Sequence, residues 1–294
     1  MPKYIHIDSN VHILTDEEAR QALERENDQE FLTEDQGIVR VPRDRWQTAQ
    51  TTERKHWMNL GIGSDTDRNQ EHFSSFGGYE VLAGESFAQA IELGCGPFTN
   101  LRLIADVCRV GECTLLDPLI ESYLSHPNRA YSRSTLTLEN TRMPQFLGRL
   151  QRKVLRHLPG MRQRLPGARR IPVARLLAVP IEEMPTDRCY NLLVIINVIE
   201  HCYDIEAVFT KILAVLEPGA VLVFHEPLFD HAVIHDRVET LYDAAHPLQV
   251  DRAVILSFLH GYFTPLFEQK SFHPNVFEGE DLSFEGIFFI GRKN

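Results

Sequence analysis

Short apolar runs and helical repeats of apolar residues alternate along the chain from about residue 86 to its end. The apolar runs predict seven strands, at 90–92, 113–116, 176–179, 191–196, 221–224, 267–272 and 286–291. Helical spacing predicts helices at 101–110, 204–216, 231–244 and 251–262. The run at 191–196 is apolar at every position after Asn191, as in a parallel strand covered on both faces. The pattern predicts an α/β fold with a doubly wound, mostly parallel seven-stranded sheet.

The first 85 residues lack this alternation and predict a helical N-terminal extension ahead of a sheet domain at 86–294. Thr15 followed by three acids indicates a helix over 16–27, because a hydroxyl caps free N–H groups and acids complement the helix dipole. Residues 38–86 are rich in aromatic and histidine side chains. We expect this segment to fold over the site as a lid, or else to pack on the sheet as ordinary helices.

Composition describes an ordinary globular protein of 294 residues, 43% of them hydrophobic. No basic and then apolar leader opens the sequence, and the longest apolar stretch, 192–199, is too short for a bilayer, so we expect a cytoplasmic protein. The five cysteines form no CxxC pair, which argues against disulfides and a structural zinc. A net charge of −11 argues against nucleic acid as a partner.

A basic insertion at 129–175 departs from this acidic balance, with eleven arginines, one lysine and one acid. Apolar and basic residues alternate at helical spacing over 146–158, which predicts an amphipathic basic helix. Three roles remain open: pairing with the acidic N-terminal segment, binding an anionic substrate or membrane surface, or holding RNA phosphates.

A glycine turn follows the first predicted strand, in the sequence AIELGCGPFTN at 90–100. Gly94 and Gly96 permit both a tight turn and the close approach of a ligand to backbone. Asp117 ends the next strand, twenty-one positions after Gly96, where an acid can accept hydrogen bonds from a ribose. The pair predicts a nucleotide-type cofactor site.

Five motifs, ELGCG (92–96), LLDP (115–118), EEMP (182–185), NVIEH (197–201) and LEPGAVLVF (216–224), together resemble those of class I S-adenosylmethionine-dependent methyltransferases, which have a Rossmann-like fold. The resemblance runs from about residue 79 to the C-terminus. It implies S-adenosylmethionine as cofactor, with its methionine part among Glu92, Gly94, Cys95 and Gly96. It further places the ribose on Asp117, the adenine near Pro118, Ile181 and Glu182, and the sulfonium beside the backbone of Asn197. Two positions depart from the family pattern: Phe98 replaces a third glycine, and Pro180 replaces an aspartate.

Histidines supply the candidates for proton transfer, since methyl transfer to a hydroxyl is helped by a base that works at neutral pH. Five follow the fourth and fifth predicted strands: His201, His225, His231, His235 and His246. We expect His225 with Glu226 to be catalytic, and His201 to be the second candidate.

A metal is the alternative aid to catalysis. NVIEH resembles the ExxEH motif of small-RNA 2′-O-methyltransferases and some ubiquinone-pathway O-methyltransferases, which implies a divalent ion on Glu200, His201 and His246. Asn197 replaces the first carboxylate of that motif, and this weakens the charge that a hard cation needs. We therefore expect no metal.

The predicted function is methyl transfer from S-adenosylmethionine to an oxygen or nitrogen of a small molecule, an anionic one if the basic insertion holds it. The alternatives are a catalytically inactive cofactor-binding subunit that acts through a partner, and a metal-assisted RNA 2′-O-methyltransferase.

Overall fold

The computed structural model describes residues 41, 43–60, 76–126, 129–138, 169–229, 245–248, 250–273 and 284–294, together with short strands elsewhere. The predicted helices at 16–27 and 146–158, and residues His231 and His235, lie outside these residues. None of the helices in the described part of the chain combines the length and apolar character needed to span a bilayer.

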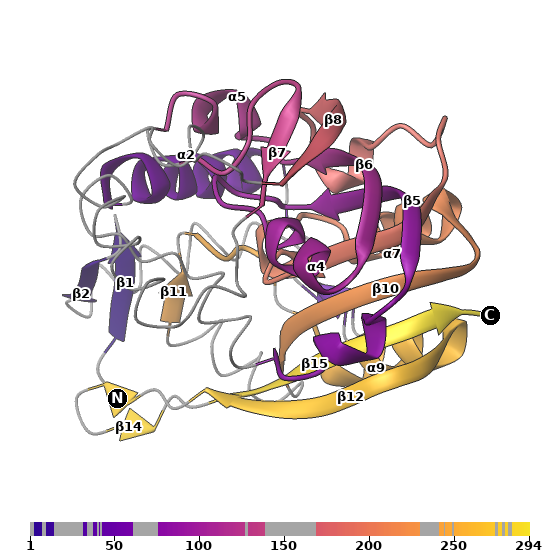
Figure 1. Ribbon diagram of the computed structural model, residues 1–294. Coiled ribbons are helices and arrows are strands. Elements are labelled where there is room, and N and C mark those ends of the chain that lie inside the picture. The colour runs from indigo at the N-terminus through magenta and orange to yellow at the C-terminus, as the bar shows by residue number, and fades with distance from the viewer. Residues whose placement is uncertain are drawn as a thin grey trace, which may run out of the picture.

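An eight-stranded sheet forms the centre of the molecule, in the order β12-β15-β10-β9-β5-β6-β8-β7 (Figure 1). Its parallel strands are β5 (Ser86–Leu93), β6 (Arg109–Leu116), β8 (Arg170–Leu177), β9 (Tyr190–Ile196) and β10 (Leu216–Leu228). The late strands β12 (Phe263–His273) and β15 (Phe284–Lys293) pair antiparallel, as their apolar runs predict. The eighth strand, β7 (Thr135–Thr137), is antiparallel to β8 at the edge, and its three residues are too few for a periodic signal.

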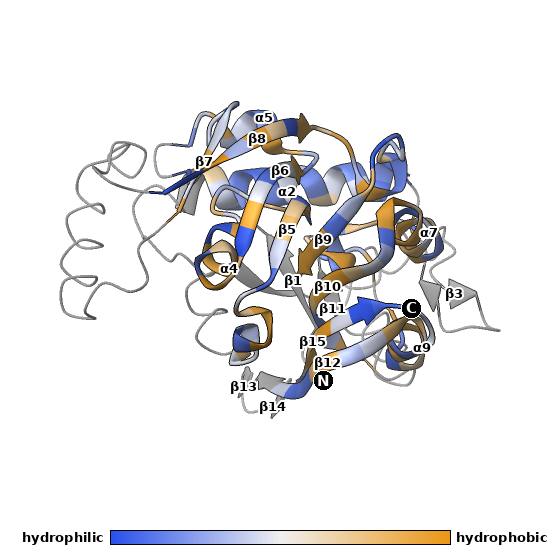
Figure 2. Ribbon diagram, turned by 45° about the vertical axis from the view of Figure 1, so that its right-hand side comes forward, coloured by the Kyte–Doolittle hydropathy of each residue, from blue (hydrophilic) through white to orange (hydrophobic). Residues whose placement is uncertain are grey.

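Both faces of this sheet are buried, which explains the continuous apolar run of β9. Leu193 and Ile195 point into a cluster that includes α7 (Ile205–Val215) and α9 (Arg252–Tyr262). Leu192 and Val194 point into the opposite cluster, which includes α4 (Leu101–Val107) and the short helix η1 (Tyr79–Leu82). Apolar colour accordingly runs through the inner strands and the helix sides that face them (Figure 2). The doubly wound sheet is confirmed.

Side-chain caps explain where two predicted helices begin. Asp204 accepts a hydrogen bond from Ala207 N at 3.1 Å before α7, and Asp251 accepts one from Ala253 N at 2.7 Å before α9. The predicted helix at 101–110 is too long, because β6 already begins at Arg109. Gly111 lies inside β6, where an added Cβ would be 2.7 Å from the carbonyl oxygen of Ala88, so close strand approach explains this glycine.

The N-terminal extension is only partly helical in its described residues. One helix, α2 (Arg43–Leu60), lies at the carboxyl end of the sheet. The strands β1 (Lys3–Ile7) and β2 (Asn10–Leu14) pair antiparallel, and β1 also pairs with β11 (Leu241–Asp243). The helix predicted at 231–244 is therefore wrong at residues 241–243.

Short strand pairs complete the described elements. β3 (Leu32–Thr33) pairs with β4 (Ile38–Val39), and β13 (Val276–Phe277) pairs with β14 (Glu280–Asp281). Two further short helices, α5 (Ile120–Tyr123) and η4 (Ile199–His201), each follow a strand of the main sheet.

Candidate active site

A cavity opens at the carboxyl ends of β5, β6 and β9, with α2 as its other wall. The strand order reverses between β5 and β9, and open α/β sheets bind ligands at this switch point. The predicted site residues Gly94, Cys95, Gly96, Asp117, Pro118, Ile181, Glu182, Asn197 and His201 all line the cavity.

Two left-handed glycines shape the first loop of the cavity. Gly94 has φ of +65° and Gly96 has φ of +52°, a region that favours glycine. An added Cβ at Gly94 would lie 2.4 Å from a Val198 methyl, whereas one at Gly96 would meet nothing within 4 Å. Tyr131 Oη steadies the loop by donating to the Gly96 carbonyl at 2.8 Å. Gly94 thus permits close packing of two loops, and Gly96 leaves open space for a ligand.

Glu92 binds the end of this loop through hydrogen bonds and does not line the cavity. Its carboxylate accepts hydrogen bonds from the Thr99 hydroxyl, from Asn100 N at 2.7 Å and from Leu101 N at 2.9 Å. Burial raises its pKa to about 7, although these hydrogen bonds oppose the shift. The resemblance places Glu92 beside the methionine part of the cofactor, but the structure directs its side chain to the start of α4.

Asp117 faces the cavity and joins two neighbouring segments. Its carboxylate accepts from Gly96 N at 3.1 Å and from Leu119 N at 2.8 Å. Burial raises its pKa to about 6. Each carboxylate oxygen has a second lone pair, so Asp117 can still accept hydrogen bonds from a ligand hydroxyl.

Glu182 lines the cavity and has one buried acceptor oxygen without a hydrogen bond among the described residues. Its Oε1 accepts from Tyr203 N at 2.6 Å and from Asp204 N at 3.1 Å, while the described residues give no hydrogen bond to its buried Oε2. A buried acceptor without a partner is costly, and burial accordingly raises the pKa of Glu182. A ligand with an amino donor would satisfy Oε2.

The structure does not place His225 and Glu226, the predicted catalytic residues, in the lining of the cavity. The His225 ring is buried and stacks on Phe288, with centroids 4.2 Å apart, and its Nε2 lies 3.4 Å from Ser271 Oγ. Glu226 accepts from Val198 N at 2.7 Å and from Ile199 N at 3.1 Å, and burial raises its pKa. Neither residue lines the cavity, so the first positions the sheet and the second positions the loop after β9.

Asn197 begins that loop with a strained backbone. Its φ of +53° is uncommon for a residue other than glycine, and its N–H donates to the His225 carbonyl at 2.8 Å. Phe98, on the opposite loop, also lines the cavity and meets Trp57 edge-on, with centroids 6.0 Å apart.

Helix α2 contributes four lining residues that were not among the predicted site residues: Trp46, Gln50, Glu53 and Trp57. The two tryptophans belong to the aromatic segment 38–86 that was expected to form a lid or to pack on the sheet. Trp46 Nε1 and Gln50 Nε2 both donate to the His201 carbonyl, at 2.9 and 3.3 Å, and fix α2 against η4. The spacing of these four residues places them on one helix face. This spacing is the feature of the sequence from which they could have been predicted to act together.

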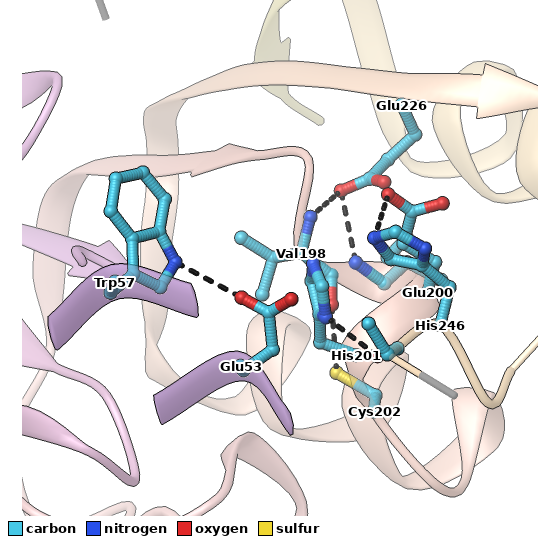
Figure 3. Close-up of polar contacts among 10 residues, drawn as sticks. Glu53, Trp57, Val198, Glu200, His201, Cys202, Glu226 and His246 are labelled. Atoms are coloured by element: carbon cyan, nitrogen blue, oxygen red, sulfur yellow. Dashed lines mark hydrogen bonds and ion pairs between the residues drawn. The ribbon is translucent and has the colours of Figure 1, made fainter. Parts of the chain in front are cut away.

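Two histidines meet next to α2 (Figure 3). The rings of His201 and His246 have centroids 4.7 Å apart. His201 Nδ1 is 3.1 Å from the Ala245 carbonyl, which can only accept, so Nδ1 carries the proton and Nε2 keeps its lone pair. His246 Nε2 lies 3.5 Å from Glu200 Oε1. The side chains Glu53, Glu200, His201 and His246 form the acceptor end of the cavity, a name used below for these four residues.

The charge of the cavity wall has one sign. Glu53, Asp117, Glu182 and Glu200 line it, and none of the described lining residues is lysine or arginine.

A switch-point cavity with a left-handed glycine turn and a strand-end acid is typical of α/β proteins that bind nucleotide-type cofactors. A profile of the methyltransferase domain family matches residues 76–283. The chain belongs to this family: it is a class I, S-adenosylmethionine-dependent methyltransferase.

Solved structures similar to the chain include two N-methyltransferases of known source. The N-methyltransferase NodS of Bradyrhizobium japonicum, solved with S-adenosylhomocysteine, is 15% identical, with a TM-score of 0.47 over 85% of this chain and 98% of that one. The 1,6-didemethyltoxoflavin-N1-methyltransferase of Burkholderia thailandensis is 14% identical, with a TM-score of 0.44 over 90% of this chain and 98% of that one. No curated protein matches the sequence.

The cavity residues fit the cofactor. Asp117 suits the ribose hydroxyls, the space beside Gly96 lets a ligand approach backbone, and Glu182 has an oxygen without a hydrogen bond in the described part of the chain that a side-chain rotation would offer to an amino group. S-adenosylmethionine is the cofactor of the enzyme, and the residues of this cavity are compatible with it.

Proposed function

We propose that the enzyme methylates an oxygen or nitrogen of a small neutral or cationic molecule bound at the acceptor end of the cavity. The proposed charge of the substrate rests on one observation. The cavity wall holds four carboxylates and, among the described lining residues, no lysine or arginine. A buried anion next to such a wall is repelled. This proposal replaces the anionic substrate suggested by the basic insertion, most of which lies outside the described residues.

The bound cofactor supplies an electrophilic methyl carbon. The protein's task is then to align the acceptor and exclude water. Trp46 and Trp57 close the α2 side with apolar surface, and α2 is joined to η4 through the His201 carbonyl. This arrangement supports a role for α2 as the cover of the site.

His201 is the group we assign to the acceptor's proton. Its Nδ1–H donates to Ala245, so Nε2 has a lone pair that can take a proton as the acceptor is methylated. Glu200 and His246 lie beside it and can stabilise the positive charge that develops.

The test combines binding with turnover. Calorimetry with S-adenosylmethionine and S-adenosylhomocysteine measures cofactor binding, and transfer of a radiolabelled methyl group is followed into matched amines, alcohols and carboxylic acids. We expect transfer to amines or alcohols and little to carboxylates. Preferred transfer to carboxylates would refute the charge argument, and cofactor binding without any transfer would favour an inactive cofactor-binding subunit.

A variant separates the role of His201 from general damage. His201→Gln should lower kcat by about 10²–10⁴-fold and leave cofactor affinity nearly unchanged. His260→Gln is the matched control, because His260 also contacts a carboxylate, Glu268 at 2.8 Å, but lies on α9 away from the cavity. Equal kcat values for the two variants would contradict the assignment.

A further inference from the structure

Glu53, His201 and His246 converge from three separate segments of the chain (Figure 3). One ligand-type atom from each lies within 4.8 Å of the other two, and all three side chains are half-buried. We propose that these three residues bind a divalent transition-metal ion at the acceptor end of the cavity.

The donor set is typical of such ions. Two imidazoles and one carboxylate bind zinc in catalytic sites and bind iron and related metals in other enzymes. Ligand atoms around a tetrahedral ion at about 2.1 Å lie roughly 3.4 Å apart, so the cluster must contract on binding. Because the three side chains are half-buried at a cavity wall, small rotations can supply this contraction without repacking the core.

Each proposed ligand already has a second partner that orients it. Trp57 Nε1 donates to Glu53 Oε2 at 3.0 Å, which leaves Oε1 for the ion. The Ala245 carbonyl holds His201 Nδ1, and Glu200 Oε1 lies 3.5 Å from His246 Nε2. Metal-binding histidines and carboxylates are commonly held by such outer contacts, which fix the ring orientation and the tautomer.

The segments that carry the ligands are also tied to one another. His246 follows the Ala245 carbonyl that contacts His201, and Leu248 N donates to the Glu200 carbonyl at 3.1 Å. Trp46 and Gln50 fix α2, and with it Glu53, against the His201 carbonyl. These hydrogen bonds therefore hold the three ligand-bearing segments together without an ion.

Charge and access favour a cation here. Glu53 and Glu200 supply two carboxylates, and the described lining residues include no competing lysine or arginine. Three protein ligands leave at least one position open toward the cavity. Asn197 offers no carboxylate at the start of NVIEH, and the acid comes from α2 instead, about 150 residues earlier.

The metal proposal extends the proposed function, and the catalytic role of the ion rests on that function. An acceptor hydroxyl bound at the open position would lose its proton more readily, and that proton would pass to the Glu200 carboxylate, which also lines the cavity. His201 would then hold the ion through Nε2 and would no longer take the proton itself.

The experiment titrates Zn²⁺ and Mn²⁺ into chelator-treated enzyme by calorimetry, without cofactor. A Cys189→Ser background removes the exposed thiol as a competing ligand. We expect one ion per chain, with affinity at least tenfold weaker in Glu53→Gln and in His246→Gln, and roughly tenfold weaker in Glu200→Gln. His260→Gln should bind the ion as the parent does.

Cofactor titration of the same preparations checks folding and separates the two proposals. Retained S-adenosylmethionine binding in Glu53→Gln and His246→Gln shows that the fold is intact. If neither ion binds, or if the ligand variants bind as well as the parent, the metal site is refuted while the proposed methyl transfer, with His201 as base, still stands. Ion binding without cofactor binding or methyl transfer would refute the proposed function alone.

Discussion

The two left-handed glycines of the cofactor loop have the same backbone cost but different neighbours, so replacing each with alanine separates strain from sterics. A left-handed residue with a Cβ costs roughly 1–2 kcal/mol. At Gly94 the new Cβ would also lie 2.4 and 2.6 Å from both methyl groups of Val198, whose branched side chain has little rotamer freedom. Overpacking of this kind adds roughly 1–3 kcal/mol. Gly94→Ala should therefore destabilise the protein by about 2–5 kcal/mol.

Gly96→Ala should behave differently, because its Cβ meets nothing within 4 Å and instead occupies space in the cavity. We expect a loss of only about 1–2 kcal/mol in the free energy of unfolding, with at least tenfold weaker cofactor binding. Gly219→Ala is the matched control: φ is +74°, the space is equally open, and the residue lies outside the cavity. Urea unfolding and calorimetry measure both quantities. If Gly96→Ala binds cofactor as well as Gly219→Ala, the ligand does not approach this loop.

Three further predictions concern the carboxylates. In Glu182→Gln the amide oxygen can keep the two backbone hydrogen bonds while its NH₂ replaces Oε2, which has no hydrogen bond among the described residues, so cofactor affinity should fall by about 10- to 100-fold; unchanged affinity would exclude an amino donor at this position. Because the pKa of Asp117 is raised to about 6, cofactor binding should weaken below pH 6, by at most tenfold per unit, and Asp117→Asn should lose this pH dependence in calorimetry. Burial raises the pKa of Asp117 from 3.8 to about 6 and the pKa of Glu92 from 4.5 to about 7. Between these values each carboxyl group holds more protons in the folded protein than in the unfolded chain. The free energy of unfolding should therefore fall as pH rises from about 4 to 7, and a rise across this window in urea titrations would contradict the burial argument.

The sheet could be predicted from sequence because its buried strands leave a strong local record. β9 is apolar at nearly every position since its side chains enter two different clusters, and α7 and α9 begin at aspartates that cap them. Element ends were less certain. Gly111 suggested a helix end, whereas its glycine is required by contact between β5 and β6, which is a long-range effect.

The sequence also predicted which loops line the cavity, but it did not predict the direction of the side chains near these loops. Glu92 ends a strand in a familiar motif, yet it points to the next helix. His225 is close to the carboxyl end of β10, where the sequence predicts ligand binding. Adjacent residues of a strand face opposite sides of the sheet, however, and the His225 ring packs in the core against Phe288. Only the register of β10 against β9 and β15 decides this.

The acceptor end could not be assembled from the sequence, because its members lie far apart in the chain. Glu53 comes from α2 and His246 from a loop almost two hundred residues later, and neither belongs to a motif. They meet through α2, which has a polar helix face and no place in the sheet pattern.

The four buried carboxylates around the cavity follow one rule that links fold to function. Glu92, Asp117, Glu182 and Glu226 each accept two or more backbone N–H groups from the segment next to them. Burial raises the pKa of all four, so the fold stabilises its loops with acids at some cost in free energy. The loops are thereby fixed before a ligand binds. Two of the four acids, Asp117 and Glu182, line the cavity and, with Glu53 and Glu200, make its wall negative. A cofactor with a sulfonium charge and, by our proposal, a divalent ion at the acceptor end both relieve that charge. Asp117 and Glu182 belong to both sets of acids, so they fix the loops of the cavity and also contribute to the charge that a ligand meets there.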